Sequence, residues 1–489
     1  MLFVTIGMLL SEIMKFIRSR FPLVFLICLL ALILSACGEF PQLKGTLEPT
    51  SLFAKTIPPA TLTALSEMEA SSQTPEPDPL GIDWLDLEGQ EVEFWYACDR
   101  DEPGAGMNAI VDRFNRENQW GITVIPQDRG LVLDPLASVE SALEEGQMPH
   151  IMVGESSVIT EWYQSGLTVD LNPFLNDPAA GMKKADQKAF YPGVFSEFIL
   201  DGSVRAGIPF SQSIQVVYYN ESWAQELDIQ SLPVTVEDYW EQSCSPAGNG
   251  EPAGLILSPQ AANILSFIYA YGGDPYISVD EGYRFSSREI REFARDWREL
   301  SLDGCGQLIS NYPNPMAIEE EFERFNQREA LMIMGSSLMQ EHIQTGWADD
   351  WQMLPFLGPG GTKVVTSDQQ SVVIFETTPK AELASWLFLK YLTSPEVQAE
   401  WSQYSGYYPT RKDSLQFLQE FRKENPAWAS GLNLLKYSRS KPPHPSWQIV
   451  KLAVEDAFEE ILASPNIDLD DQLDVLDLVA SELLEWGRE

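Results

Sequence analysis

From about residue 90 onward, short apolar runs alternate with amphipathic segments, and this alternation most constrains the fold. The helical segments repeat apolar residues at helical spacing, as in Ile290, Phe293, Trp297 and Leu300. Strands alternating with helices predict an α/β fold with mostly parallel sheets and flanking helices. The expected strands cover residues 92–97, 122–125, 151–153, 215–219, 255–257, 331–334 and 372–375.

The length of the chain predicts two lobes. At 489 residues the chain exceeds the roughly 250–300 residues at which a single hydrophobic core stops growing. Two lobes, each with its own core, are therefore expected.

The first 36 residues have the layout of a signal peptide. Lys15, Arg18 and Arg20 precede an apolar run over residues 21–34, which is shorter than the roughly 20 residues of a membrane-spanning helix. Met14 opens a more ordinary signal than Met1 does, and both starts stay open.

The end of this signal, Leu34-Ser35-Ala36-Cys37, resembles the lipobox of bacterial lipoproteins. That resemblance implies cleavage before Cys37 and diacylation of its thiol. The chain would then be anchored to the outer face of the cell membrane. The alternative is an uncleaved anchor with an incidental cysteine.

The formal net charge excludes one class of partner. It is −40, and removal of residues 1–36, which carry +2, makes it −42. Such a surface repels the phosphate backbone of nucleic acids and favours a neutral or cationic ligand over an anionic one. Solvation of a large surface also explains much of the charge. Nothing in the sequence indicates self-association, so a monomer is expected.

The cysteines suggest one disulfide. Beyond Cys28 in the signal and Cys37, the chain has Cys98, Cys244 and Cys305. Outside the cytosol two of these can pair. We favour Cys244 with Cys305, because the first ends a short helical pattern and the second follows a longer one; a bridge to Cys98 stays open. No spacing of cysteines and histidines suggests a metal site, and no cofactor is expected.

Residues 37–88 have little hydrophobic period and recurrent prolines, which predicts a flexible tether between the lipid and the folded body.

Several segments follow one another in an order that is similar to the family 1 extracellular solute-binding proteins, the group containing the maltose-binding protein. None is specific alone, but together they cover most of residues 90–465. In the first half they are 92–96 (VEFWY), 113–117 (RFNRE), 149–153 (PHIMV), 162–171 (WYQSGLTVDL), 207–209 (GIP), 217–220 (VYYN), 233–239 (PVTVEDY) and 271–274 (YGGD). In the second half they are 325–335 (FNQREALMIMG), 354–360 (LPFLGPG), 384–398 (ASWLFLKYLTSPEVQ) and 406–409 (GYYP).

This resemblance implies the two-lobed periplasmic-binding-protein fold of type II. It places one lobe at residues 90–212 plus 370–406 and the other at 214–366 plus 410–489. Crossovers would lie near 209–213, 364–370 and 407–410. A small solute, with a sugar favoured, would be bound between the lobes and delivered to the permease of an ABC transporter.

The resemblance also places a set of polar and aromatic residues at the cleft, on loops or crossovers near strand ends. Aromatic rings can stack on sugars, and carboxylates, amides and hydroxyls can pair with sugar hydroxyls. A structural role is open for each of them. The candidates are Trp95, Asp99, Glu155, Ser156, Ser157, Gln212, Gln215, Tyr271, Ser336, Ser337, Gln369, Gln370 and Tyr408. Trp162, Trp297 and Trp386 lie in helical patterns and are expected in the core.

One departure from the family pattern weakens the sugar assignment. A tryptophan that stacks on the ligand commonly follows the element ending at Gly335, but Ser336 and Ser337 stand there. Either Trp347 or Tyr408 supplies the aromatic platform, or the ligand is not a maltose-like oligosaccharide. Family members also take glycerol phosphate esters and polyamines.

An enzyme is the competing class. The sequence has no HExxH, G-x-S-x-G, P-loop or EF-hand motif. Residues 468–471 (DLDD) lack the glycine of a calcium loop and fit the start of the last helix. A hydrolase with paired carboxylates stays open because 72 acidic residues offer many chance pairs. A lipoprotein that senses a solute for a signalling partner would have the same fold.

Overall fold

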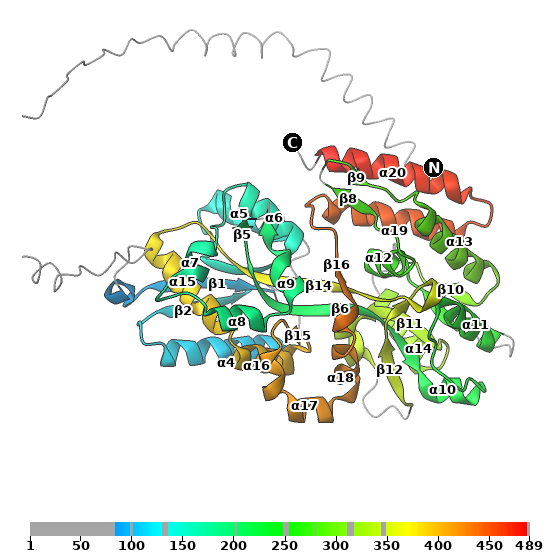
Figure 1. Ribbon diagram of the computed structural model, residues 1–489, viewed down its shortest axis with the longest axis horizontal. Coiled ribbons are helices and arrows are strands. Elements are labelled where there is room, and N and C mark those ends of the chain that lie inside the picture. The colour runs from blue at the N-terminus through cyan, green and yellow to red at the C-terminus, as the bar shows by residue number, and fades with distance from the viewer. Residues whose placement is uncertain are drawn as a thin grey trace, which may run out of the picture. The chain divides into compact units, whose positions relative to one another are not determined.

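A computed structural model describes residues 84–97, 101–129, 135–200, 203–247, 254–278, 280–310, 317–343 and 349–486 (Figure 1). The predicted signal peptide, Cys37, Cys98, Asp99 and Trp347 lie outside these ranges. Every helix within them is too short or too polar to span a bilayer.

One mixed sheet organises the fold, in the strand order β10-β7-β11-β6-β14-β3-β1-β2. These strands are β1 (Glu91–Tyr96), β2 (Thr123–Asp128), β3 (Ile151–Glu155), β6 (Ile208–Asn220), β7 (Leu255–Leu257), β10 (Gly306–Leu308), β11 (Met332–Ser336) and β14 (Lys363–Ile374). Four short strands pair with β6 or β14, namely β12 (Trp351–Leu354), β13 (Phe356–Leu357), β15 (Tyr408–Pro409) and β16 (Ser438–Ser440). Two separate hairpins are formed by β4 (Ile199–Leu200) with β5 (Val204–Arg205) and by β8 (Tyr276–Ser278) with β9 (Gly282–Tyr283).

The parallel pairing expected from the sequence occurs at the two ends of the sheet. There β1 pairs in parallel with β2 and β3, and β7 with β10. In the middle, β6 and β14 pair antiparallel with each other and with β11 and β3. Because these two long strands cross the sheet in opposite directions, it is mixed rather than mostly parallel. Nearly all residues of β6 are buried, as expected for a strand covered on both faces.

The three predicted crossovers lie side by side at the centre of the sheet. Gln212 of β6 is the register partner of Gln369 on one side and of Tyr408 on the other. These three segments are far apart in the sequence but adjacent in the sheet (Figure 1).

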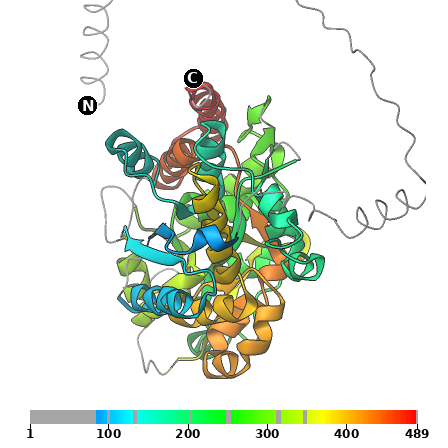
Figure 2. The ribbon, with the colours of Figure 1, turned by 90° about the vertical axis from the view of Figure 1, so that its left-hand side faces the viewer.

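Around β1–β3, helices α4 (Asp101–Glu117), α15 (Pro379–Leu392) and α16 (Pro395–Ser405) contact one another. Figure 1 and Figure 2 show α4 alongside β2. Helix α15 begins at Thr378, whose hydroxyl caps the amide of Ala381, and buries Trp386 completely. The other helices here are η1 (Trp84–Leu87), α5 (Pro135–Glu145), α6 (Ser156–Gln164), α7 (Asn172–Asn176), α8 (Lys184–Ala189) and α9 (Pro192–Glu197).

Around β7 and β10, helices α12 (Ala261–Ala270), α13 (Arg288–Leu302), α19 (Trp447–Ala463) and α20 (Leu469–Trp486) share an aromatic core. Trp297 is fully buried between Phe267 and Phe458. Trp162, Trp297 and Trp386 are thus core residues, as predicted. The remaining elements are α10 (Glu221–Glu226), α11 (Val236–Ala247), α14 (Ala317–Asn326), η2 (Ser337–His342), η3 (Pro359–Gly361), η4 (Asp413–Phe417), α17 (Gln419–Glu424), α18 (Pro426–Leu432) and η5 (Leu435–Tyr437).

Two boundaries can be compared with the sequence analysis. Leu87 of η1 is fully buried against the core around β1, so the folded body begins before residue 88, where the tether was expected to end. The proline-rich sequence before it does not predict the short 3-10 helix η1, whose Leu87 is buried. At the other end of the chain, the carboxylate of Asp468 accepts hydrogen bonds from the amides of Asp470 and Asp471. It caps α20, as the sequence indicates.

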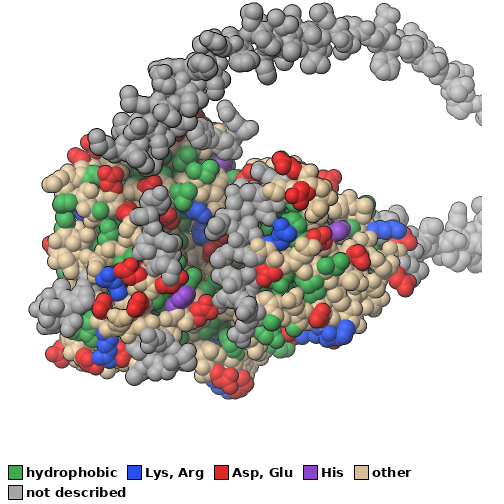
Figure 3. Space-filling model, turned by 180° about the vertical axis from the view of Figure 1, so that it is seen from behind, with side chains coloured by type: hydrophobic (Ala, Val, Ile, Leu, Met, Phe, Trp, Pro, Cys, Tyr) green, Lys and Arg blue, Asp and Glu red, His purple; other side chains and the backbone are tan. Residues whose placement is uncertain are grey.

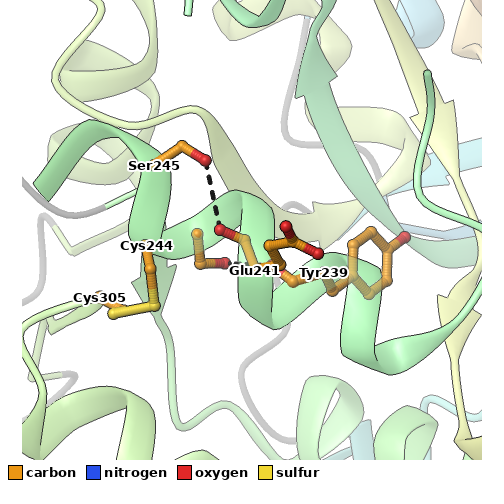
Figure 4. The surroundings of a disulfide bond; sticks show 6 residues. Tyr239, Glu241, Cys244, Ser245 and Cys305 are labelled. Atoms are coloured by element: carbon orange, nitrogen blue, oxygen red, sulfur yellow. Dashed lines mark hydrogen bonds between the residues drawn. A yellow bond between two sulfur atoms is a disulfide. The ribbon is translucent and has the colours of Figure 1, made fainter. Parts of the chain in front are cut away.

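The structure contains the disulfide that the sequence favours. Cys244 near the end of α11 is bonded to Cys305, which precedes β10, across 61 residues of chain (Figure 4). The backbone carbonyl of Cys305 also accepts a hydrogen bond from the amide of Leu255. The bond therefore fastens α11 to the edge of the sheet.

Candidate functional site

Charged side chains from four separate segments converge beside the central strands. Glu155 ends β3, Glu197 ends α9, Asp368 lies in β14 and Lys441 follows β16. Together with Ser367, Gln369, Pro442 and Trp447 they line one cavity. We call Glu155, Glu197, Asp368 and Lys441 the charged cluster. The cavity has a volume of about 10 Å³, which holds about one water molecule, so the side chains themselves fill this place.

The register of β14 explains why these segments meet. Ser367 pairs with Ile214 of β6 on one edge and with Ser440 of β16 on the other. Gln370 pairs with Glu155 of β3, on the same edge as β16. Strands β16 and β3 therefore lie one after the other along β14, and Glu155 and Lys441 are brought together where they adjoin.

Hydrogen bonds connect the segments across this junction. The ammonium of Lys441 lies 2.7 Å from Oδ2 of Asp368. The hydroxyl of Ser440 donates to Oε2 of Glu197 at 2.6 Å. Gln369 donates from Nε2 to the hydroxyl of Ser367 at 3.2 Å. The carboxylate that ends α9 is thus held against β16, and Lys441, which follows β16, is held against β14.

The electrostatics of the charged cluster is governed by an excess of carboxylates. Burial would lower the pKa of Lys441, but Asp368, Glu155 and Glu197 outweigh it and raise that pKa, so Lys441 is cationic. The pKa of Glu155 is raised, mainly by repulsion from Asp368, while Lys441 and Lys451 act in the opposite direction. The ammonium groups of Lys441 and Lys451 therefore only partly offset the repulsion between Glu155 and Asp368.

Gln369 contributes a further acceptor. Its side chain is in contact with the cavity, and the residue is only 5% exposed. Its Oε1 accepts no hydrogen bond from any residue that the structure describes. A buried amide oxygen without a donor is unfavourable by about 1–3 kcal/mol, so this oxygen favours a ligand with a donor group.

Among the residues predicted from the sequence, the structure brings Glu155 and Gln369 together in the cavity. Gln370 and Gln212 lie next to it in the paired strands but make internal bonds. Gln370 donates to the hydroxyl of Tyr407 at 3.2 Å, and Gln212 to the carbonyl of Pro409 at 3.0 Å. These two amides hold the central strands together.

The aromatic candidates occupy hydrophobic cores instead of the cavity. Trp95 is 3% exposed and packs under the guanidinium of Arg129. Tyr408 is fully buried against Trp428, and the hydroxyl of Tyr271 donates to Asp296 at 2.7 Å. None of these three rings is among the residues that line the cavity, so their place at a ligand stays a prediction from the sequence.

The serine candidates make local structural bonds where they are described. Ser337 is fully buried and its hydroxyl accepts from the amide of Ile214, and Ser336 caps η2 through the amide of Leu338. Gln215, the register partner of Ser336, has a buried Oε1 without a donor among the described residues. Ser156 and Ser157 open α6, and their side chains lie outside the described part, as Asp99 does.

Six residues that line the cavity were not predicted from the sequence: Glu197, Ser367, Asp368, Lys441, Pro442 and Trp447. Asp368 lies inside a crossover that the sequence did indicate. Lys441 could have been noticed as a basic residue before a proline-rich turn, residues 442–445 (PPHP), in a strongly acidic chain. Glu197 carries no such signal.

A metal ion does not suit this arrangement. Among the described residues, no three side chains of His, Cys, Asp or Glu are close enough together to hold one. The carboxylates of the charged cluster are instead spread around the cavity.

Known proteins share this architecture. A family model described as bacterial extracellular solute-binding protein matches residues 109–430. The sn-glycerol-3-phosphate-binding periplasmic protein UgpB of Escherichia coli (strain K12) is 23% identical over 380 residues, covering 72% of this chain and 82% of that protein. The sugar-binding protein MalE from Xanthomonas citri has a similar fold, with a TM-score of 0.70 and 18% identity over 82% of this chain and 98% of that one. UgpB from Mycobacterium tuberculosis in complex with glycerophosphocholine gives a TM-score of 0.66 and 15% identity over 82% and 100%.

Proposed function

This chain belongs to the bacterial extracellular solute-binding proteins, and on that basis we propose that it captures a small polar solute between two lobes and delivers it to an ABC transporter permease. It is an extracytoplasmic binding protein and not an enzyme. The solute resembles a sugar or a glycerol phosphate ester in being small and rich in hydrogen-bonding groups, as the names of its relatives suggest.

The charged cluster is the observation that carries this proposal. Glu155 and Glu197 belong to the proposed lobe of residues 90–212 plus 370–406, and Lys441 to the other proposed lobe, although β3 and β16 adjoin along the same edge of β14. A solute that bridges these groups stabilises the arrangement in which the two sides are close. A ligand can drive closure only by binding the closed form better than the open one.

The paired strands β6, β14 and β15 are the proposed hinge. Lobes at residues 90–212 plus 370–406 and at 214–366 plus 410–489 would rotate about them. The separation of the two largest hydrophobic cores supports this division, since one uses residues 87–210 and 372–401 and the other residues 217–364 and 447–484. Small changes of backbone dihedral in a few connecting residues are enough for such a motion.

Ligand binding by the full chain is tested by thermal and chemical unfolding against sugars, polyamines, amino acids and glycerol phosphates. A ligand present at a hundred times its Kd is expected to raise the free energy of unfolding by about 2.7 kcal/mol. The same incubations are analysed for turnover. Consumption of a compound would contradict the assignment as a binding protein, and so would the absence of a shift with every class.

The lipid anchor at Cys37 is also part of the proposal. Expressed in a bacterium, the wild-type chain is expected in the membrane fraction with an acylated N-terminal Cys37, while Cys37→Ser is expected to lose acylation and cleavage at this site. Globomycin, which blocks lipoprotein signal cleavage, should leave the wild type as the longer precursor. A mature wild-type protein with an unmodified Cys37 would contradict the anchor without affecting the binding function.

A further inference from the structure

We propose that the solute presents an ammonium group to the charged cluster, as an amino sugar or a polyamine does. The inference rests on the proposed function and specifies the ligand of the same site. It follows from the balance of charge, from an unsatisfied acceptor and from the spacing of the carboxylates.

The charged cluster contains three carboxyl groups and one ammonium group. Asp368 lies within salt-bridge distance of the Lys441 ammonium, and Glu155 and Glu197 also act on that ammonium. Glu155 lies close enough to Asp368 for repulsion between the two carboxylates to dominate its electrostatics. A further cation between them would add to the effect of Lys441 and Lys451 and relieve this repulsion, because opposite charges within about 4–6 Å stabilise the ionised carboxylates.

Gln369 supplies an independent observation. Its Oε1 faces no donor among the described residues although the side chain is buried beside the same cavity. The cavity is therefore rich in acceptors: carboxylates and an amide oxygen. An ammonium group has three donors and no acceptor, so it complements this lining better than a hydroxyl group, which brings both.

The spacing of the carboxylates distinguishes an organic cation from a metal ion. No three acidic, cysteine or histidine side chains within the described ranges form a metal-sized group. An ammonium on a carbon skeleton can reach carboxylates that are farther apart. The acidic side chains spread over the surface in Figure 3 also attract cations to the molecule.

An anionic headgroup fits poorly. Lys441 is already bound to Asp368 at 2.7 Å, so a phosphate would have to displace that carboxylate and then lie near Glu155 and Glu197. Like charges at such a place raise the free energy of the complex. The charged cluster therefore disfavours glycerol 3-phosphate as the solute of this chain.

The test compares amines with analogues whose amino groups carry no charge because they are N-acetylated. The full chain, purified in detergent, is titrated calorimetrically with D-glucosamine, chitosan oligosaccharides and spermidine, and with the N-acetylated form of each. D-Glucose and glycerol 3-phosphate complete the panel. At least one amine is expected to bind at least tenfold more tightly than its N-acetylated form, a difference of about 1.4 kcal/mol. The amine that binds tells an amino sugar from a polyamine.

The outcomes separate this inference from the proposed function. Binding of a neutral sugar or glycerol 3-phosphate without any preference for amines would overturn the ammonium group and leave the solute receptor intact. Binding of no compound in the panel would contradict the ammonium group as well as the receptor function.

Two variants assign the effect to the charged cluster. Glu155→Gln and Asp368→Asn keep the shape of their side chains and remove one charge each. Both are expected to weaken binding of the amine about tenfold or more and to change binding of its N-acetylated form much less. Glu482→Gln, at an exposed position of α20, is the matched control. Unchanged amine affinity in folded Glu155→Gln and Asp368→Asn would overturn the proposal.

Discussion

The double variant Cys244→Ala/Cys305→Ala is expected to lose about 4 kcal/mol of unfolding free energy relative to the oxidised wild type. The bond closes a loop of 61 residues, and the loss of loop-closure entropy in the unfolded chain predicts a stabilisation of this size. Urea unfolding of both proteins without reductant measures it. Since a typical domain is stable by roughly 5–15 kcal/mol, this is a large share.

The control for the disulfide uses the same two proteins with a reductant. The wild type should then lose most of its advantage, whereas the double variant should not respond. Equal stability of the oxidised wild type and the double variant would show that the region around α11 and β10 holds together without the bond. A response of the double variant to reductant would point to Cys98 instead.

At pH 8, Glu321→Gln is expected to be more stable than the wild type by about 4–5 kcal/mol. Glu321 in α14 is 1% exposed, and burial raises its pKa to about 8, while the neighbouring hydroxyl of Ser258 offsets only part of this and Glu320 adds to it. Its Oε1 accepts no hydrogen bond from the described residues. Ionisation of this carboxyl in the folded protein is therefore unfavourable.

The sign of the pH dependence follows from the direction of this shift. The folded pKa lies above the unfolded value of about 4.3, so the stability that the protonated form provides is complete below pH 4.3 and is lost as the pH rises toward 8. Urea unfolding should give nearly equal stabilities at about pH 4 and a growing advantage for Glu321→Gln up to pH 8. Glu319→Gln, exposed on the same helix, should show no such trend. A difference independent of pH would mean that Glu321 is ionised in the folded state.

These two predictions concern the lobe around β7 and α14 and leave the charged cluster unchanged. A stability change in either variant can thus be separated from binding by repeating the amine titration. Retained amine affinity in Glu321→Gln would show that the buried carboxyl is structural, while altered affinity would connect α14 to the cleft.

The polar residues of the site were predictable only in part. Glu155 and Gln369, predicted from a strand end and a crossover, line the cavity, because such positions can be recognised locally. Trp95 and Tyr408 pack in hydrophobic cores, and an alternating pattern gives two faces without saying which one meets the core. Glu197 and Ser440 are 243 residues apart, and nothing local to either indicates that they touch.

The sequence by itself predicted several of the helices and strands, because their apolar periodicity is a property of neighbouring residues. The stripe of Ile290, Phe293, Trp297 and Leu300 predicts α13 and its buried face, and both are found. The tertiary structure alone decided which polar groups share the cavity. That choice depends on the register of β14 with β3, β6 and β16, which brings Glu155, Asp368 and Lys441 together from distant parts of the chain. Register arises from long-range packing and backbone pairing, which cannot be predicted from the sequence of any single segment.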